Sequence, residues 1–238
     1  MTAHSPDPLH ILSAGAAQGL VTRLAPKFFE ETGVALRTTF GAVGAIREKL
    51  AAGERCDVLI LTDALIKQLA TGRHASAGTS AALGRVQTGI GVRMRDALPS
   101  IDSQAALEQS LRMATDVFVP DLRRSTAGVH FARVLQQLAI LEEMTPRLRA
   151  YPNGATAMRA LAQSNSRSPI GCTQVTEIKF TEGVMLVGPL PRQFELSTVY
   201  SIAVQSDARQ PEAAQRFARL LSGAATASVR AEAGFEAA

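Results

Sequence analysis

Strand-like and helix-like segments alternate along this sequence, and at five places a strand ends in small residues directly before a helix begins. These junctions are Ala14–Ala17, Gly41–Gly44, Thr62-Asp63, Ser125–Gly128 and Asn153-Gly154. Such alternation is typical of a sheet with mainly parallel strands, because each helix carries the chain back to start the next strand. The pattern therefore predicts an α/β fold.

The length of the chain allows one large domain or two smaller lobes, since 238 residues are near the upper limit for a single hydrophobic core. Ser80–Gln87 and Gly188–Glu195 are the best candidates for two crossings between lobes. A chain that leaves one lobe and returns to complete it would use two such segments as a hinge. We expect lobe 1 to hold residues 1–83 and 194–238, and lobe 2 residues 84–193.

Periodicity places several elements within this pattern. Apolar residues recur at helical spacing in Gln18–Thr32, and Cys56–Leu61 is a continuous apolar run typical of a buried parallel strand. Leu83–Val92 is expected to form a longer strand. Helices are expected at Ala45–Ala52 and Val129–Leu138, just after two of the small-residue junctions.

Composition excludes several function classes. The net charge is +4, and the basic residues are scattered, so the sequence predicts no nucleic-acid partner. No apolar stretch is long enough to cross a membrane. Cys56 and Cys172 are interpreted as buried free thiols. The four histidines do not cluster and no zinc spacing exists, so no metal and no cofactor are predicted.

The first residues lack the charged and apolar regions of a secretory signal. As written, the chain is expected to be cytoplasmic. If a leader had been removed, the expectation would be periplasmic.

The small-residue junctions predict an anion-binding site. Each helix start has unpaired backbone amides and the positive end of the helix dipole, and small residues let an anion come close. In open α/β sheets ligands bind at the carboxyl ends of strands. The backbone and hydroxyl groups expected to bind an anion are those of Ala14, Gly15, Ala16, Gly41, Ala42, Val43, Gly44, Thr62, Ser125, Thr126 and Gly154.

The roles of three side chains can each be interpreted in two ways. Arg124, beside Arg123, could clamp a carboxylate or be a solvated loop residue. His130 and Glu177 are the weak candidates for a catalytic base. The alternative for His130 is a packed or solvated side chain, and the alternative for Glu177 is a carboxylate stabilised by a helix dipole.

Longer motifs resemble the periplasmic molybdate-binding proteins of ABC transporters. They are Leu12-Ser-Ala-Gly-Ala16, Leu24-Ala-Pro-Lys-Phe-Phe-Glu-Glu-Thr-Gly33, Phe40-Gly-Ala-Val-Gly-Ala45, Cys56–Leu61, Ser125-Thr-Ala-Gly-Val-His-Phe131, Gly188-Pro-Leu-Pro191 and Thr198-Val-Tyr200. The resemblance covers nearly the whole chain. It implies the type II periplasmic-binding-protein fold, with two Rossmann-like lobes, a two-strand hinge and a small anion in a closing cleft. It also adds Thr173, Gln174 and Tyr200 to the expected ligand-binding residues, and an ABC transporter permease as partner if the chain is exported.

The resemblance also implies a change of ligand. Family members bind their oxyanion through two serine hydroxyls and a tyrosine, and these places correspond to Ala16, Val43 and Gln174 here. Each lost hydrogen bond to a charged ligand would cost about 1.5–3 kcal/mol, so tight binding of molybdate is not expected.

The motifs Ser13-Ala-Gly-Ala16, Thr173-Gln-Val-Thr-Glu177 and Gly188-Pro-Leu-Pro191 look like a divergent branch that also resembles aconitate isomerase. Two hypotheses follow. The first is a protein that binds a small carboxylate or oxyanion. The alternative is an isomerase of a small unsaturated polycarboxylate, for which a proton-transferring base is needed.

Overall fold

The computed structural model describes residues 7–76 and 78–238. Contacts between residues divide the chain into two compact units, which are described separately. Unit 1 runs up to Arg85 and resumes over Thr198–Ala238, and unit 2 is Val86–Ser197. The chain therefore changes unit twice, within strand β4 (Ala81–Arg93) and at the start of strand β9 (Ser197–Val204).

The sheet of unit 1 has the strand order β2-β1-β3-β9. Strand β1 (Leu9–Ala14) is parallel to both β2 (Leu36–Gly41) and β3 (Val58–Thr62), and β9 runs antiparallel to β3. The first three strands consequently end at the same edge of the sheet.

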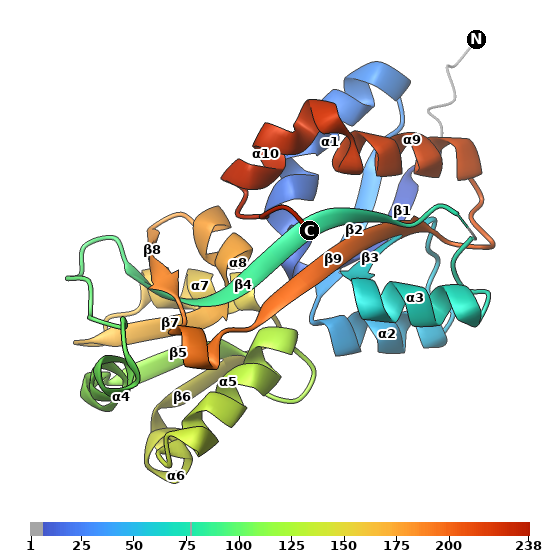
Figure 1. Cartoon of the computed structure of the whole chain (residues 1–238). Coiled ribbons are helices and arrows are strands. Elements are labelled where there is room, and N and C mark those ends of the chain that lie inside the picture. Colours follow the sequence, from blue (N-terminus) through green and yellow to red (C-terminus); the bar gives the residue numbers. More distant parts are fainter. Residues whose placement is uncertain (1–6, 77) are drawn as a thin grey trace. The chain divides into compact units, whose positions relative to one another are not determined.

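Helices cover both faces of this sheet (Figure 1). Helices α2 (Val43–Ala51) and α3 (Asp63–Thr71) lie on one face, where Leu12, Leu59 and Leu61 pack against Ile46 and Ile66. On the other face lie α1 (Gln18–Thr32), α9 (Pro211–Ser222) and α10 (Ala227–Glu232). There the rings of Phe28 and Phe217 meet edge to face, with their centroids 5.1 Å apart.

The sheet of unit 2 has the order β4-β7-β5-β6, and β8 (Val184–Pro189) pairs with the other side of β4. Strands β5 (Asp116–Pro120), β6 (Leu148–Tyr151) and β7 (Pro169–Gln174) are parallel, whereas β4 runs antiparallel to β7. The carboxyl ends of β5, β6 and β7 therefore share one edge.

The helices of unit 2 also pack on two faces. Helices α4 (Gln104–Met113), α5 (Thr126–Gln137) and the short α6 (Leu141–Met144) cover one face, over a core that includes Leu107, Phe131 and Val134. Helices α7 (Gly154–Gln163) and α8 (Val175–Phe180) cover the other, with Phe118, Met158 and Ile178 between them and the sheet. Figure 1 shows the two groups on opposite sides of the strands.

The predicted α/β fold is confirmed, and the helix starts differ from the prediction in one informative way. Helix α2 begins at Val43 and α5 at Thr126, earlier than the expected Ala45 and Val129. Ala42 and Ser125 take the extended N-cap conformation, so the small residues that follow form the first helical turn. The junctions are thus helix starts themselves, not loops before helices. Short helix α6 was not predicted.

Two further expectations can be compared with the structure. Across residues 7–76 and 78–238, no helix combines the length and apolar character needed to cross a membrane. Cys56 and Cys172 are buried free thiols, as predicted. Burial raises the pKa of the Cys56 thiol to about 12 and also raises that of Cys172, so neither is a ready nucleophile.

Candidate anion-binding site

The junction residues of unit 1 lie side by side along one edge of its sheet. Ala14 at the end of β1 is opposite Gly41 at the end of β2, and Ser13 is opposite Ile60 of β3. Thr62 ends β3 and is opposite Tyr200 of β9. The structure therefore brings together the predicted residues of this unit, namely Ala14–Ala16, Gly41–Gly44, Thr62 and Tyr200.

Two helix starts at this edge lack any side-chain acceptor of their own. The N-cap residues of α1 and α2 are Ala17 and Ala42, and alanine has no polar side-chain atom with which to cap a helix. The first turn of α2 is Val43-Gly44-Ala45, which contains no acid. The positive end of α2 is consequently left to water or to an external anion.

The start of α3 differs, because it carries the carboxylate of Asp63. Asp63 accepts hydrogen bonds from Lys67 Nζ at 2.7 Å and from Ser201 Oγ at 2.8 Å. The bond from Lys67 is the main reason that the pKa of Asp63 is lowered, with a further contribution from Ser201. Within the described residues, Thr62 makes no side-chain capping bond at this helix start.

In unit 2 the ends of three parallel strands bring the starts of α5, α7 and α8 to one edge. Pro120 at the end of β5 is opposite Tyr151 at the end of β6, and Phe118 of β5 is opposite Gly171 of β7. The predicted residues of this unit therefore also gather at one edge. They are Arg124, Ser125, Thr126, Gly154, Thr173 and Gln174.

The start of α7 is occupied by the chain's own side chains. Asn153 Oδ1 accepts from the Thr156 amide at 2.8 Å, which is a side-chain cap. Glu177 Oε1 accepts from the Gly154 amide at 3.1 Å, and Thr173 Oγ1 donates to Glu177 Oε2 at 2.5 Å. Gly154 and Thr173, both predicted ligand residues, are therefore already bound to an internal carboxylate.

Glu177 is almost completely buried, with 4% of its surface exposed. Burial raises its pKa above the ordinary value, while hydrogen bonds from Thr173 and from the amides of Ala155 and Gly154 act in the opposite direction. Residue 154 must be glycine here, because a Cβ would lie 2.0 Å from both Glu177 Oε2 and Thr173 Oγ1. Glu177 is thus held at the starts of two helices, α7 and α8.

The loop before α5 is organised by Asp121. Its Oδ1 accepts from the Arg123 and Arg124 amides at 2.8 and 3.0 Å, and its Oδ2 accepts from Arg124 Nε at 2.9 Å. Burial opposes ionisation, yet these bonds hold the pKa of Asp121 below its ordinary value. The guanidinium of Arg124 is therefore engaged by a carboxylate of the chain. A Cβ on Gly128 would lie 2.3 Å from the Asp121 carbonyl oxygen, which explains the glycine in the first turn of α5.

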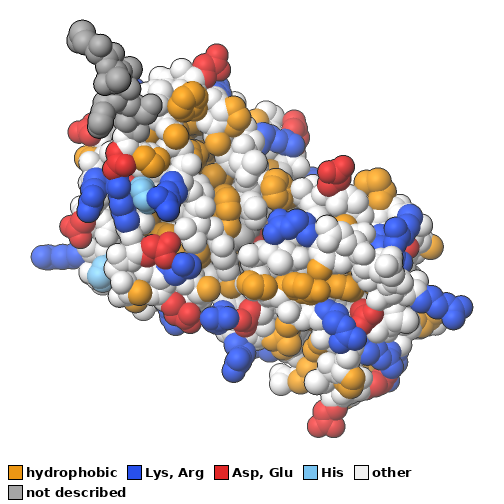
Figure 2. Space-filling view, turned by 180° about the vertical axis from the view of Figure 1, so that it is seen from behind, with side chains coloured by type: hydrophobic (Ala, Val, Ile, Leu, Met, Phe, Trp, Pro, Cys, Tyr) orange, Lys and Arg blue, Asp and Glu red, His pale blue; other side chains and the backbone are white. Residues whose placement is uncertain are grey.

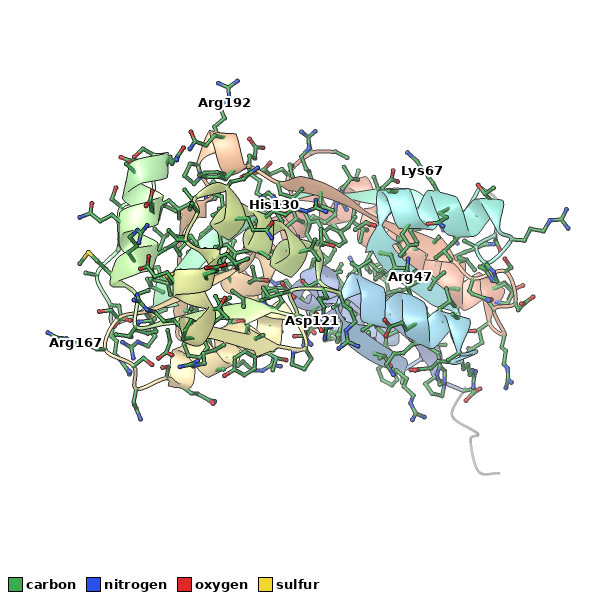
Figure 3. All side chains as sticks on the ribbon, turned by 90° about the horizontal axis from the view of Figure 1, so that it is seen from below. Arg47, Lys67, Asp121, His130, Arg167 and Arg192 are labelled. Atoms are coloured by element: carbon green, nitrogen blue, oxygen red, sulfur yellow. The ribbon has the colours of Figure 1, made fainter. Side chains whose placement is uncertain are left out.

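His130 lies on α5 (Figure 3), one turn beyond the helix start. Its Nε2 is 2.7 Å from the Phe194 carbonyl oxygen, which can only accept, so Nε2 is the donor. This contact gives His130 a structural partner within unit 2.

Buried polar groups that sequence reasoning did not single out lie at the same edge of unit 2. Thr88 sits on the inward face of β4 between Val86 and Ile90, and all three are at most 1% exposed. A polar residue in an otherwise apolar period-2 face is a signal that could have identified it. Thr176, in the first turn of α8, is 3% exposed.

Charge on the surface agrees with a small-ligand site better than with a polyanion site. On the face shown in Figure 2, Lys and Arg side chains lie among acidic and uncharged ones and do not form one stripe. Among residues that the structure describes, no group of three or more His, Cys, Asp or Glu is placed to hold a metal ion.

Comparison with solved structures identifies the fold. The structure superposes on the periplasmic molybdate-binding protein of Azotobacter vinelandii with a TM-score of 0.80, covering 97% of this chain and 99% of that one at 16% identity. A sulfate-binding protein from Mycobacterium tuberculosis gives a TM-score of 0.70, covering 98% and 86% at 18% identity. The predicted type II periplasmic-binding-protein fold is confirmed.

Sequence comparison then identifies the family. Residues 9–236 match the family described as bacterial extracellular solute-binding protein, and the chain belongs to it. The chain is also 27% identical over 245 aligned positions to an aconitate isomerase from a Pseudomonas species, covering 99% of this chain and 90% of that protein.

Proposed function

We propose that this protein binds a small organic polycarboxylate, and that the helix starts of α1 and α2 in unit 1 bind its negative charge. The observation that carries the proposal is the contrast between helix starts. Those of α1 and α2 follow alanine caps and carry no acid in the first turn, whereas that of α7 already holds Glu177.

A carboxylate fits this arrangement better than a tetrahedral oxyanion. The positions at which the resemblance implies serine hydroxyls hold Ala16 and Val43, so unit 1 offers mainly backbone amides there. The similar Pseudomonas protein is named for aconitate, a tricarboxylate, which supports the same ligand class. We further propose that an ABC transporter permease is the partner if the chain is exported.

An isomerase is the second candidate, and Glu177 is the observation that favours it. Moving a double bond along a polycarboxylate requires a base that takes a proton from one carbon of the allylic unit and returns it to the other end. The raised pKa of buried Glu177 suits a group that must both accept and release a proton. The similarity to aconitate isomerase points to the same reaction.

One experiment tests both functions. Thermal unfolding is followed with molybdate, sulfate, citrate, and cis- and trans-aconitate, and the aconitate samples are then analysed by NMR for the other isomer. A bound ligand at one hundred times its Kd stabilises the folded state by about 2.7 kcal/mol, and we expect this from carboxylates only.

The outcomes separate the candidates. Carboxylate stabilisation without conversion supports the binding role, and conversion of cis- to trans-aconitate supports the isomerase. Stabilisation by molybdate or sulfate alone would refute both.

A further inference from the structure

A group of buried polar atoms in unit 2 has no hydrogen-bonding partner anywhere in the described chain. They are Oε1 and Nε2 of Gln174 and the Oγ1 atoms of Thr88 and Thr176. These three residues are at most 3% exposed. Buried polar groups are nearly always hydrogen-bonded, because an unpartnered one costs stability. Folding alone therefore does not account for these side chains.

Two of these residues are neighbours across paired strands, and the third is close in the sequence. Thr88 of β4 is directly opposite Gln174 of β7 in the antiparallel pair, so their side chains point to the same face of the sheet. The Cβ atoms of such a pair are about 4.5–5.5 Å apart. Gln174 is the N-cap of α8, and Thr176 lies in the first turn of that helix. The unpartnered atoms, here called the cluster, thus belong to residues at or near the carboxyl end of β7, the edge at which ligands bind in open α/β sheets.

Polar groups next to this cluster do find partners. Thr173 and Glu177 flank Gln174 and Thr176 in the sequence. Thr173 donates to Glu177, which also accepts from the Gly154 amide. The unpartnered atoms are therefore not a general property of this region, although Ser197 Oγ of unit 2 also lacks a partner.

The chemistry of the cluster indicates what it can bind. A glutamine amide offers two donor hydrogens and one acceptor oxygen, and a threonine hydroxyl can donate and accept. A fully ionised oxyanion only accepts, so it can bond to Gln174 Nε2 but gives no hydrogen bond to Oε1. A ligand group with an O–H satisfies both atoms of the amide.

We propose that Thr88, Gln174 and Thr176 bind an O–H group of the ligand and thereby select carboxylates that donate as well as accept a hydrogen bond. This inference rests on the proposed polycarboxylate-binding function. The O–H has two possible sources, an alcohol hydroxyl or a carboxyl group that keeps its proton, and the test distinguishes them.

The test uses ligand pairs that differ by one hydroxyl. Citrate is compared with tricarballylate, and malate with succinate, by isothermal titration calorimetry of the full chain. The wild-type protein is compared with Gln174→Leu, and the control is Gln137→Leu, an exposed glutamine of α5 in the same unit.

We expect the wild-type protein and Gln137→Leu to prefer the hydroxylated member by at least about tenfold, because a site built to bond a hydroxyl rejects the analogue without it. In Gln174→Leu the ratio of the affinity for the hydroxylated member to that for the other member should fall to about 1. The ligand-free Gln174→Leu variant should also melt a few degrees higher than wild type, since it no longer buries two unpartnered polar atoms.

A second measurement shows whether the O–H comes from a carboxyl group that keeps its proton. If tricarballylate and succinate bind as tightly as their hydroxylated partners, titrations in two buffers of different ionisation enthalpy should show proton uptake that Gln174→Leu loses. The inference would be overturned if wild type and Gln174→Leu had the same affinity ratio for ligands with and without the hydroxyl and neither took up a proton. Carboxylate binding would then still stand. No binding of any of the four compounds would refute the proposed function, and this inference with it.

Discussion

Two helix starts of unit 1 and one of unit 2 are formed in opposite ways. In unit 1 the starts of α1 and α2 follow Ala17 and Ala42, which have no side-chain acceptor. In unit 2 the start of α7 is capped by Asn153 and also bound by the buried carboxylate of Glu177.

This difference shows that a helix start after a parallel strand is only a potential anion site. Whether it can bind a ligand depends on whether another side chain of the fold already fills it. Unit 1 keeps the starts of α1 and α2 available for charge. Unit 2 fills one of them and presents neutral polar groups instead, those of Thr88, Gln174 and Thr176.

The largest effect is expected from alanine substitution at two glycines, one beside the filled start of α7 and one beside the unfilled start of α2. In unit 2, Gly154→Ala would place a Cβ 2.0 Å from Glu177 Oε2, and in unit 1, Gly41→Ala would place one 3.2 Å from Ile46 Cδ1. We expect Gly154→Ala to destabilise the protein by about 3 kcal/mol, because the helix start and the carboxylate cannot both stay in place. Gly41→Ala should cost less than about 1 kcal/mol, since the end of an isoleucine side chain can move.

Urea unfolding followed by circular dichroism measures both variants. An equal loss in the free energy of unfolding would mean that the start of α7 is no more tightly filled than that of α2.

Removing one backbone amide in unit 1 tests whether the start of α2 binds the ligand. Val43 is the first residue of α2, where proline is tolerated, and Ala42 already has the extended conformation that proline requires before it. We expect Val43→Pro to fold normally and to weaken carboxylate binding about tenfold, since it deletes a donor to a charged ligand.

The matched control for this variant is Gln104→Pro, at the first residue of α4 in unit 2, which should not change binding. Titration calorimetry gives both affinities. Unaltered binding by Val43→Pro would remove α2 from the proposed site.

The smallest expected effect is a difference in pH dependence between the two helix-start acids. The pKa of Asp63 is lowered in the folded state, so its contribution to stability is present above its unfolded pKa and is lost as the pH falls through the folded pKa. The pKa of Glu177 is raised, so its contribution is greatest below its unfolded pKa and falls as the pH rises toward the folded pKa.

Accordingly, Asp63→Asn should flatten the stability profile on its acidic side, and Glu177→Gln should remove a decline with rising pH. Urea unfolding across a pH series checks this. The same direction of change in both variants would show that the two acids are held in equivalent surroundings.

Much of the fold could be predicted from the sequence because its signals are local. Helix α1 has the predicted bounds, since helical periodicity is read within a few residues. Helices α2 and α5 were expected to begin later, because small residues look like a loop until the N-cap conformation of the residue before them is known.

The candidate site was less accessible to sequence reasoning. The small-residue junctions indicated which strand ends to examine, and the structure gathers them at one edge of each unit. Nothing local in the sequence shows that Glu177 binds the Gly154 amide 23 positions earlier. Thr88 and Gln174 likewise become neighbours only when β4 pairs with β7.

The sequence by itself determined the alternation of strands and helices, the small residues at their junctions and hence the α/β fold, because these depend on conformational preferences of neighbouring residues. Only the tertiary structure decided which helix starts are already filled and which buried polar atoms lack partners. Hydrogen bonds to a buried group depend on which distant segments pack around it, and that information is contained in the packing of the sheet, not in any one stretch of the chain.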